Sequence, residues 1–401
     1  MRVLVLTNYV PYPPDAGAKI RVSNQMRYVS QEHEVVLLCP VRPNSRQTEN
    51  AQRLVEGGYC TRVEAVPWHK RSKIKFLPHL LRYVCNGEPI GNLTFYYEEL
   101  VEALRHITAA EHFDVIDVHH GTMAPYIDAI APGYQGKTIL ALHNVPYVQW
   151  RRMMLFERNV YQKLKLFRDW LFQKHATLKY IRRYDRTIVN SELDRSLLLQ
   201  DAPCADIVAV PTGLSTDVFE PLNAPHKFRD LMLVGSMYYR PNIDAALLLG
   251  HEIFPLIKRQ VPDVRLFIVG SSPPREVLRL GEEVDGITVT GYVDSVQPYY
   301  ERSCLNLVPL RAGSGVRVKI LESMMLGRPV VSTTLGCEGL RVTHDENILI
   351  ADTVDDFAAQ TVRIMREPEL WRRITGNGRR QVEQVYDWRV TGRQLVQAFQ
   401  G

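Results

Sequence analysis

The sequence predicts an α/β fold with two Rossmann-like parallel-sheet domains, on three observations. Short apolar segments alternate with helical segments along most of the 401 residues, a pattern typical of parallel strands joined by crossover helices. The pattern ends in a turn-rich segment and starts afresh at Leu231–Val234. The chain is also long enough for two domains of ordinary size. We therefore assign residues 1–222 and 223–385 to the two domains and 386–401 to a C-terminal helix.

Composition narrows the class of protein. Apolar residues make up 45% of the chain and charged residues 23%, which are globular values. The formal net charge of +5 is too small to indicate nucleic acid as a partner. Six cysteines have no paired spacing, so we expect reduced thiols in a cytoplasmic protein. The sequence has no run of 18 apolar residues, so we expect no membrane span. Arg2–Leu6 is too short for the core of a secretion signal.

The first half reads as strands that end in polar loops. Expected strands are Val3–Leu6, Glu34–Cys39, Asp114–Val118, Thr138–Leu142, Arg186–Asn190 and Ile207–Pro211. A proline-rich loop containing Gly17 follows the first strand, where doubly wound sheets place a ligand loop. The loop lacks the GxGxxG pattern, so a dinucleotide fingerprint is absent.

Three histidines follow two of these strands. His119 and His120 come after Asp114–Val118, and His143 comes after Thr138–Leu142. Clefts of α/β proteins open at the carboxyl ends of strands. A metal site built from these histidines is conceivable, but no motif with ligand spacing supports it, and we expect no metal.

A strongly basic segment lies between Arg151 and Arg183. It holds ten Lys or Arg residues against two acids, together with several aromatic and aliphatic side chains. A basic helix with aromatics is typical of segments that lie on an anionic membrane surface. An ordinary domain helix with a solvated basic face has the same composition, and both interpretations stay open.

The second half repeats the strand and helix alternation. Expected strands are Leu231–Val234, Val264–Val269, Ile287–Thr290, Cys304–Leu310 and Pro329–Thr334. Two of them run into glycines, Gly235 and Gly270.

The stretch Pro309–Leu340 is the most informative part of the chain. A turn with Gly313 and Gly315 lets backbone approach a ligand, and a helix is expected over Val316–Leu326. The N-terminus of such a helix favours a phosphate.

Lys319 and Glu322 fall on the same face of this predicted helix as Gly315, and Arg317 lies in its first turn. A cation near phosphates and a carboxylate that accepts from ribose hydroxyls suit a nucleoside diphosphate. The alternative is that Lys319 and Glu322 form a surface ion pair of spacing i,i+3.

These residues resemble the donor site of family 4 glycosyltransferases, which have the GT-B fold. The run LESMMLGRPVV supplies Glu322 as the second Glu of the family motif, while Ser314 stands where the first Glu is usual. Residues 210–221 are similar to the family's interdomain signature, and Tyr386 and Trp388 match the motif that marks the return of the C-terminal helix to the first domain.

The resemblance implies a retaining, metal-independent hexosyltransferase without a cofactor. It would move a sugar from a nucleotide-diphospho sugar to a glycan or lipid-linked acceptor, as in bacterial exopolysaccharide or other cell-surface glycan synthesis, at the cytoplasmic face of the membrane. The implied catalytic residues are His143, Arg317 and Lys319. The implied donor-binding residues are Gly17, Gly235, Ser236, Arg240, Gly270, Tyr292, Val293, Gly313, Ser314, Gly315, Val316 and Glu322.

Two other functions stay open. Ser314, Ser236 and Pro241 depart from the family pattern and favour a nucleotide-sugar-binding protein that transfers nothing. A GT-B-like sugar-nucleotide epimerase would need carboxylates for acid and base chemistry. Its candidates are Asp15, Asp117 and Glu322.

Overall fold

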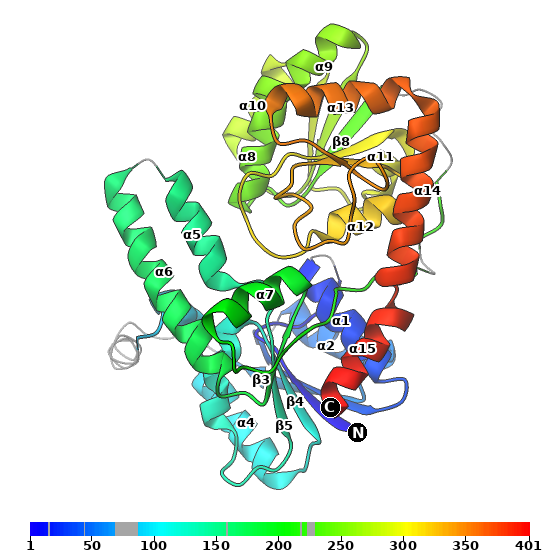
Figure 1. Ribbon diagram of the computed structural model, residues 1–401. Coiled ribbons are helices and arrows are strands. Elements are labelled where there is room, and N and C mark those ends of the chain that lie inside the picture. The colour runs from blue at the N-terminus through cyan, green and yellow to red at the C-terminus, as the bar shows by residue number, and fades with distance from the viewer. Residues whose placement is uncertain (15–16, 44, 69–86, 158, 217–218, 223–228) are drawn as a thin grey trace. The chain divides into compact units, whose positions relative to one another are not determined.

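The computed structural model contains two compact units (Figure 1). It describes residues 1–401 apart from 15–16, 44, 69–86, 158, 217–218 and 223–228. The first unit comprises Met1–Gly213 together with Trp388–Gly401, and the second comprises Leu214–Asp387. The predicted division at residue 222 therefore falls inside the second unit, and the C-terminal helix counts with the first.

The first unit is built on a parallel sheet with the strand order β3-β2-β1-β4-β5-β6-β7. Its strands are β1 (Arg2–Leu6), β2 (Glu34–Val41), β3 (Arg62–Pro67), β4 (Val115–His119), β5 (Lys137–Ala141), β6 (Arg186–Val189) and β7 (Ile207–Ala209). The apolar runs of the central strands are buried on both faces, as a parallel sheet covered by helices requires.

Helices cover both faces of this sheet. They are α1 (Gly17–Val29), α2 (Arg46–Glu56), η1 (Ile90–Phe95), α4 (Glu98–Ala110), η2 (Gly121–Ala129), α5 (Pro146–Phe156), α6 (Val160–Ile181), α7 (Glu192–Asp201) and α15 (Trp388–Gln400). One core joins the sheet to α1, α2 and α15, and the other joins it to α4, η2, α6 and α7. The C-terminal helix α15 is also held by Arg186, whose Nη1 donates to the Ala398 carbonyl over 2.8 Å.

The basic segment forms two helices rather than one. Helix α5 ends at Phe156, and α6 begins at Val160, where Asn159 caps the helix by accepting from the Gln162 amide over 3.1 Å. The two helices lie side by side as a hairpin (Figure 1). Across the described ranges of the chain, no helix has both the length and the apolar character needed to cross a bilayer.

The second unit has a parallel sheet with the strand order β10-β9-β8-β11-β12-β13. Its strands are β8 (Asp230–Val234), β9 (Arg265–Val269), β10 (Ile287–Gly291), β11 (Leu305–Val308), β12 (Val330–Ser332) and β13 (Leu349–Ile350). Its helices are α8 (Arg240–Leu248), the π-helical turn η4 (Leu249–Ile253), α9 (Phe254–Gln260), α10 (Arg275–Glu283), α11 (Gln297–Arg302), α12 (Val318–Met325), α13 (Val354–Arg366) and α14 (Pro368–Val385).

Both sheets are therefore Rossmann-like, as the alternation of apolar and helical segments predicts. The order of strands reverses next to β1 in one sheet and next to β8 in the other. Doubly wound sheets bind ligands at such switch points, beyond the carboxyl ends of the strands. Residues that follow β1, β4, β8 and β11 are thus the first to consider for function.

Candidate functional site

In the second unit, β8 and β9 end at two glycines that face each other closely. The Gly235 amide donates to the Val269 carbonyl over 2.9 Å, and a Cβ added to Gly270 would overlap the Gly235 carbonyl oxygen. Only glycine fits Gly270 in this arrangement, so the strand ends present bare backbone. The Ser236 and Ser271 hydroxyls lie 2.9 Å apart just beyond.

The helix next to this edge begins later than the sequence predicts. Helix α12 starts at Val318, not Val316. Gly313 and Gly315 have φ angles of 110° and 83°, and Arg317 has φ −92° and ψ 88°, so the backbone becomes helical only after Arg317. The prediction that Arg317 lies in the first helical turn is wrong, since it occupies the position before that turn.

The guanidinium of Arg317 folds back on its own loop. It is 8% exposed, and its Nη1 donates to the Gly315 carbonyl. A Cβ on Gly313 would lie 3.0 Å from Arg317 Nη2 and 3.1 Å from the Tyr239 hydroxyl, so these three residues are tightly packed. Arg317 therefore places a positive charge beside the turn that precedes α12.

Lys319 joins the start of α12 to the glycine edge. Its Nζ donates to the Val234 carbonyl over 2.9 Å and to Asn242 Oδ1 over 3.0 Å. A Cβ on Gly235 would lie 2.9 Å from the same nitrogen. Burial, together with the nearby charge of Arg317, lowers the pKa of Lys319 to about 7.

Glu322 lies one turn deeper on the same side of α12. Burial raises its pKa to about 7, and Lys319 opposes that shift. Among the residues that the structure describes, no hydrogen-bond donor pairs with its carboxylate, and no ion pair joins it to Lys319. The surface ion-pair interpretation is therefore wrong, and the carboxylate is open to a ligand's hydroxyl groups.

The remaining predicted residues of the second unit gather at the same edge. The Ser314 hydroxyl is buried and has no hydrogen-bond partner in the described part of the chain, while Val316 packs against the main core. Arg240 begins α8 with an exposed side chain. The Gly270 amide donates to the Gly291 carbonyl over 3.3 Å, which brings Tyr292 and Val293 beside the glycine edge.

In the first unit, buried histidines meet beyond β4 and β5. His119 Nδ1 lies 3.1 Å from His143 Nε2, and His119 Nε2 lies 3.0 Å from Asp117 Oδ2. The His120 ring lies over the His143 ring with centroids 3.8 Å apart, and its Nε2 lies 2.9 Å from the Tyr9 hydroxyl.

Burial lowers the pKa of His120 to about 3 and holds that of His143 well below its ordinary value, so both rings are neutral at pH 7. No group of side chains in the described ranges is arranged to hold a metal ion. The sequence places the histidines at this edge, but their contact with Asp117 was not foreseen. Its signal is the i,i+2 spacing of Asp117 and His119, which puts both on one face of a strand.

The proline-rich loop contributes less that can be described. Gly17 is the exposed first residue of α1, and Asp15 lies outside the described residues. On the same helix, Arg21 is buried and donates to the Thr212 hydroxyl over 2.8 Å and to the Val210 carbonyl. Arg21 thus has a structural role in fixing the segment that leaves the first unit.

Comparison with known proteins gives a consistent result. Residues 229–367, which contain every predicted residue from Gly235 to Glu322, match the family model described as Glycosyl transferases group 1. An uncharacterized 44.6 kDa protein in the cps region of Klebsiella pneumoniae is 20% identical, with 96% of each chain covered.

Solved structures resemble the whole chain. Sucrose-phosphate synthase from Thermosynechococcus elongatus superposes with a TM-score of 0.73 at 18% identity, covering 100% of this chain and 98% of its own. Anabaena HepE in complex with UDP-glucose has a TM-score of 0.66 at 13% identity, covering 100% and 99%. At these identities the likeness establishes the fold, which is GT-B, and the family match adds a Glycosyl transferases group 1 domain at residues 229–367; together the two findings support a glycosyltransferase.

Proposed function

We propose that the chain is a retaining transferase that moves a hexosyl group from a nucleotide-diphospho sugar to a glycan or lipid-linked acceptor. The observation that carries this proposal is the convergence of Gly235, Gly270, Lys319 and Glu322 at one edge of the second unit. Bare backbone lets a ligand approach closely, the cation suits the diphosphate, and the open carboxylate suits the ribose hydroxyls of a nucleoside diphosphate.

The diphosphate would bind where α12 begins. Unpaired amides of a first helical turn and the helix dipole favour an anion there. Arg317 and Lys319 add positive charge within the same turn and loop. This charge supports departure of a diphosphate leaving group without a metal ion, because fixed cations and dipoles stabilise the charge that develops.

The nucleoside would lie along Gly291–Val293, with Glu322 accepting from ribose hydroxyls. Gly291 has a φ of 69° and turns the backbone out of β10, so polar backbone groups are available to a base at this point. Tyr292 is 74% exposed and offers a ring on which a base can stack.

In the transfer step, the bond from the anomeric carbon to the diphosphate breaks and the acceptor hydroxyl bonds to that carbon on the same face. The hydroxyl proton passes to the departing phosphate oxygen, so no protein nucleophile is needed. His143 contributes a neutral imidazole for a hydroxyl of the transferred sugar. Ser314 takes the place of a carboxylate in the family motif, so its hydroxyl would hydrogen-bond the sugar without adding charge.

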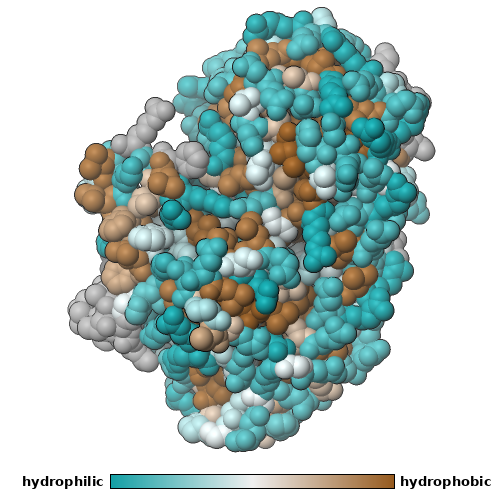
Figure 2. All heavy atoms as spheres, in the orientation of Figure 1, coloured by the Kyte–Doolittle hydropathy of each residue, from teal (hydrophilic) through white to brown (hydrophobic). Residues whose placement is uncertain are grey.

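The hairpin of α5 and α6 supports a membrane-associated acceptor. Its end exposes large apolar side chains, with Leu155 61%, Val160 72%, Tyr161 74% and Leu164 64% exposed. Apolar residues gather at this hairpin in Figure 2. The basic residues Arg151, Lys163 and Lys165 are exposed beside them. Apolar contact and attraction to anionic lipids together give peripheral binding. The cps-region relative also fits a role in cell-surface glycan synthesis.

The experiment is a transfer assay with UDP-, GDP- and ADP-sugars on a panel of lipid-linked and free glycan acceptors. Product linkage is read by NMR, and we expect the anomeric configuration of the donor to be kept. Tight nucleotide binding with no product on any acceptor would instead favour a binding protein, as the Ser314 departure allows. Interconversion of the free nucleotide sugars would favour the epimerase.

A further inference from the structure

Asp117, His119 and His143 form a hydrogen-bonded chain in the first unit that the proposed transfer leaves largely unused. Asp117 and His119 alternate on β4 and so share one face of the strand. Strand β5 pairs with β4 in a register that sets Ala141 beside His119, and His143 follows two residues later. Asp117 and His119 are 2% and 1% exposed. This depth keeps the contacts away from bulk water.

The donor and acceptor roles along this chain follow by elimination. A carboxylate only accepts, so the hydrogen between Asp117 Oδ2 and His119 Nε2 belongs to the imidazole. With a single hydrogen on its ring, His119 has one donor and one acceptor, so its Nδ1 accepts. The hydrogen between the two rings therefore comes from His143 Nε2. The same rule leaves His143 Nδ1 without a hydrogen.

We propose that Asp117 and His119 are positioning residues that fix His143 in the tautomer with an unprotonated Nδ1, which accepts a hydrogen bond from a hydroxyl of the donor sugar. This assignment of the ligand rests on the proposed function, whereas the tautomer rests on the first unit alone. No donor to His143 Nδ1 is found among the described residues, so the acceptor is open to a substrate.

The surroundings keep His143 neutral. Titratable groups near its ring are Tyr9 after β1, Arg21 on α1, His119 and His120, with Asp117 behind His119. Burial, His120, His119 and Arg21 all lower the pKa of His143. A neutral ring with a fixed hydrogen presents one acceptor and cannot turn into a donor during binding.

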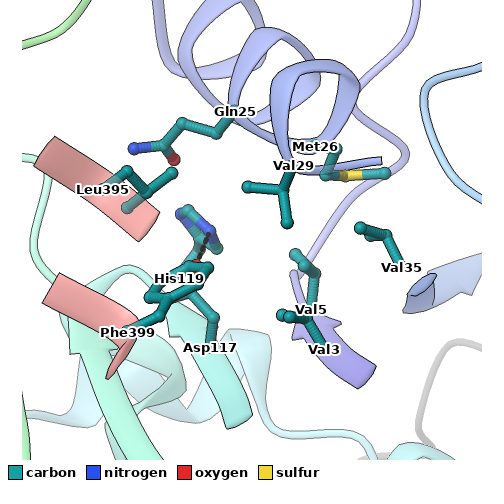
Figure 3. A pocket seen from close by; sticks show the side chains of 10 residues that line it. All are labelled: Val3, Val5, Gln25, Met26, Val29, Val35, Asp117, His119, Leu395 and Phe399. Carbon is teal, nitrogen blue, oxygen red and sulfur yellow. Dashed lines mark hydrogen bonds and ion pairs between the residues drawn. The ribbon is translucent and has the colours of Figure 1, made fainter. Parts of the chain in front are cut away.

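A small cavity lies beside Asp117, at the carboxylate end of the hydrogen-bonded chain (Figure 3). It has a volume of about 10 Å³ and is lined by Gln25, Asp117 and His119, with Leu395 and Phe399 of α15 closing one side. Asp117 Oδ1 and both polar atoms of the Gln25 amide are buried without hydrogen-bond partners in the described chain. The rest of the cavity lining is apolar, so we expect no ordered water in it.

The tautomer itself is tested by NMR of the full-length protein labelled with ¹⁵N-histidine, with ring signals assigned through His119→Gln and His120→Gln. We expect a protonated Nε2 and an unprotonated Nδ1 for His143 across the neutral pH range. A hydrogen on Nδ1 of His143 in the unaltered protein would overturn the proposal without any further variant.

Two substitutions extend the test. Asp117→Leu removes the acceptor, so His119 should move its hydrogen to Nδ1 and His143 should invert its tautomer. Asp128→Leu removes an exposed carboxylate that pairs with Arg183, and should leave both rings unchanged. In the transfer assay, Asp117→Leu should lower kcat/KM about tenfold to a hundredfold, because His143 then presents a donor where the substrate needs an acceptor.

The tautomer of His143 and the sugar hydroxyl as its ligand can be refuted independently of each other. If no donor is turned over by the unaltered protein, the proposed function is wrong, while the ring assignment is still decided by the NMR spectrum. If transfer occurs and Asp117→Leu inverts the tautomer without changing kcat/KM, then His143 does not accept from the sugar, and the proposed ligand is wrong.

Discussion

The buried amine of Lys319 should take up a proton when a nucleoside diphosphate binds. Its pKa is lowered to about 7 in the protein alone, mainly by burial. At pH 8 about one-tenth of the molecules therefore carry the charge. A diphosphate next to the amine favours the charged form and restores nearly full protonation, so binding should take up about 0.9 proton per site.

Glu322 changes the expected proton uptake only slightly at pH 8. Its pKa is raised to about 7, so it is already about nine-tenths ionised. Acceptance of ribose hydroxyls then releases about 0.1 proton, and a net uptake of about 0.8 is expected. By the same linkage, affinity should fall about sixfold to tenfold for each pH unit between about 8 and 9, because more of the free protein lacks the charge.

Calorimetric titration with UDP, GDP and ADP in buffers of different ionisation enthalpy measures this proton uptake directly. Lys319→Met keeps the length of the side chain and removes the charge, so the uptake should vanish and affinity should fall about tenfold or more. Lys258→Met is the matched control, since Lys258 pairs with Asp285 on the surface of the same unit. Zero uptake in the unaltered protein, or equal uptake in Lys319→Met, would refute the phosphate role of Lys319.

Three more predictions follow from other parts of the molecule. Glu322→Gln should remove most of the preference for UDP over 2′,3′-dideoxy-UDP, about tenfold or more in Kd; an undiminished preference would exclude Glu322 from the ribose site. Arg21→Met should lower the free energy of unfolding of the first unit by about 2 to 4 kcal/mol, measured in urea, because Val210 and Thr212 lose a buried donor. The control Arg27→Met, on the exposed side of α1, should lower it by under about 0.5 kcal/mol. Charge reversal at four basic positions of the α5–α6 hairpin should release the protein from phosphatidylserine vesicles, and reversal of three exposed arginines of α14 should not; equal retention of both variants would contradict the membrane role. The four basic positions of the hairpin are Arg151, Arg152, Lys163 and Lys165, and the three control arginines of α14 are Arg372, Arg373 and Arg380.

The sequence predicts the α/β architecture well because its signals are local. Mostly apolar segments such as Val3–Leu6 and Val264–Val269 are typical of buried parallel strands, and the structure has β1 and β9 there. Short or half-buried elements escape the same reasoning. Strand β3 is half-buried up to its exposed last residue, and β13 has two residues, so neither forms a continuous apolar run.

The start of α12 shows why site geometry is harder to predict than fold. Periodicity alone extends the helix to Val316, but two glycines with positive φ delay it to Val318. The consequence is chemical, since Arg317 turns toward its own loop while Lys319 reaches back to Val234. Contacts between segments far apart in the chain, such as Lys319 with Asn242, leave no local signal.

The histidine chain is an intermediate case. The strand ends place His119 and His143 at one edge of the sheet, which the sequence indicates. Their hydrogen bond depends on the register of β4 and β5, and the Asp117 contact depends on burial of that face under α1 and α15. No short motif encodes the register, and the motif at Tyr386 and Trp388 does not indicate which residues α15 covers, so the hydrogen-bonded chain could not be predicted from the sequence.

The central claim is that a diphosphate binds where α12 begins, held by Arg317 and Lys319 and without a metal ion. The most direct measurement is a crystal structure of the protein with whichever of UDP, GDP or ADP binds best. The account predicts phosphate oxygens within hydrogen-bonding distance of the first amides of α12 and of Lys319 Nζ, with the ribose hydroxyls on Glu322. A nucleotide bound elsewhere, or phosphates held through a metal ion away from these groups, would contradict it.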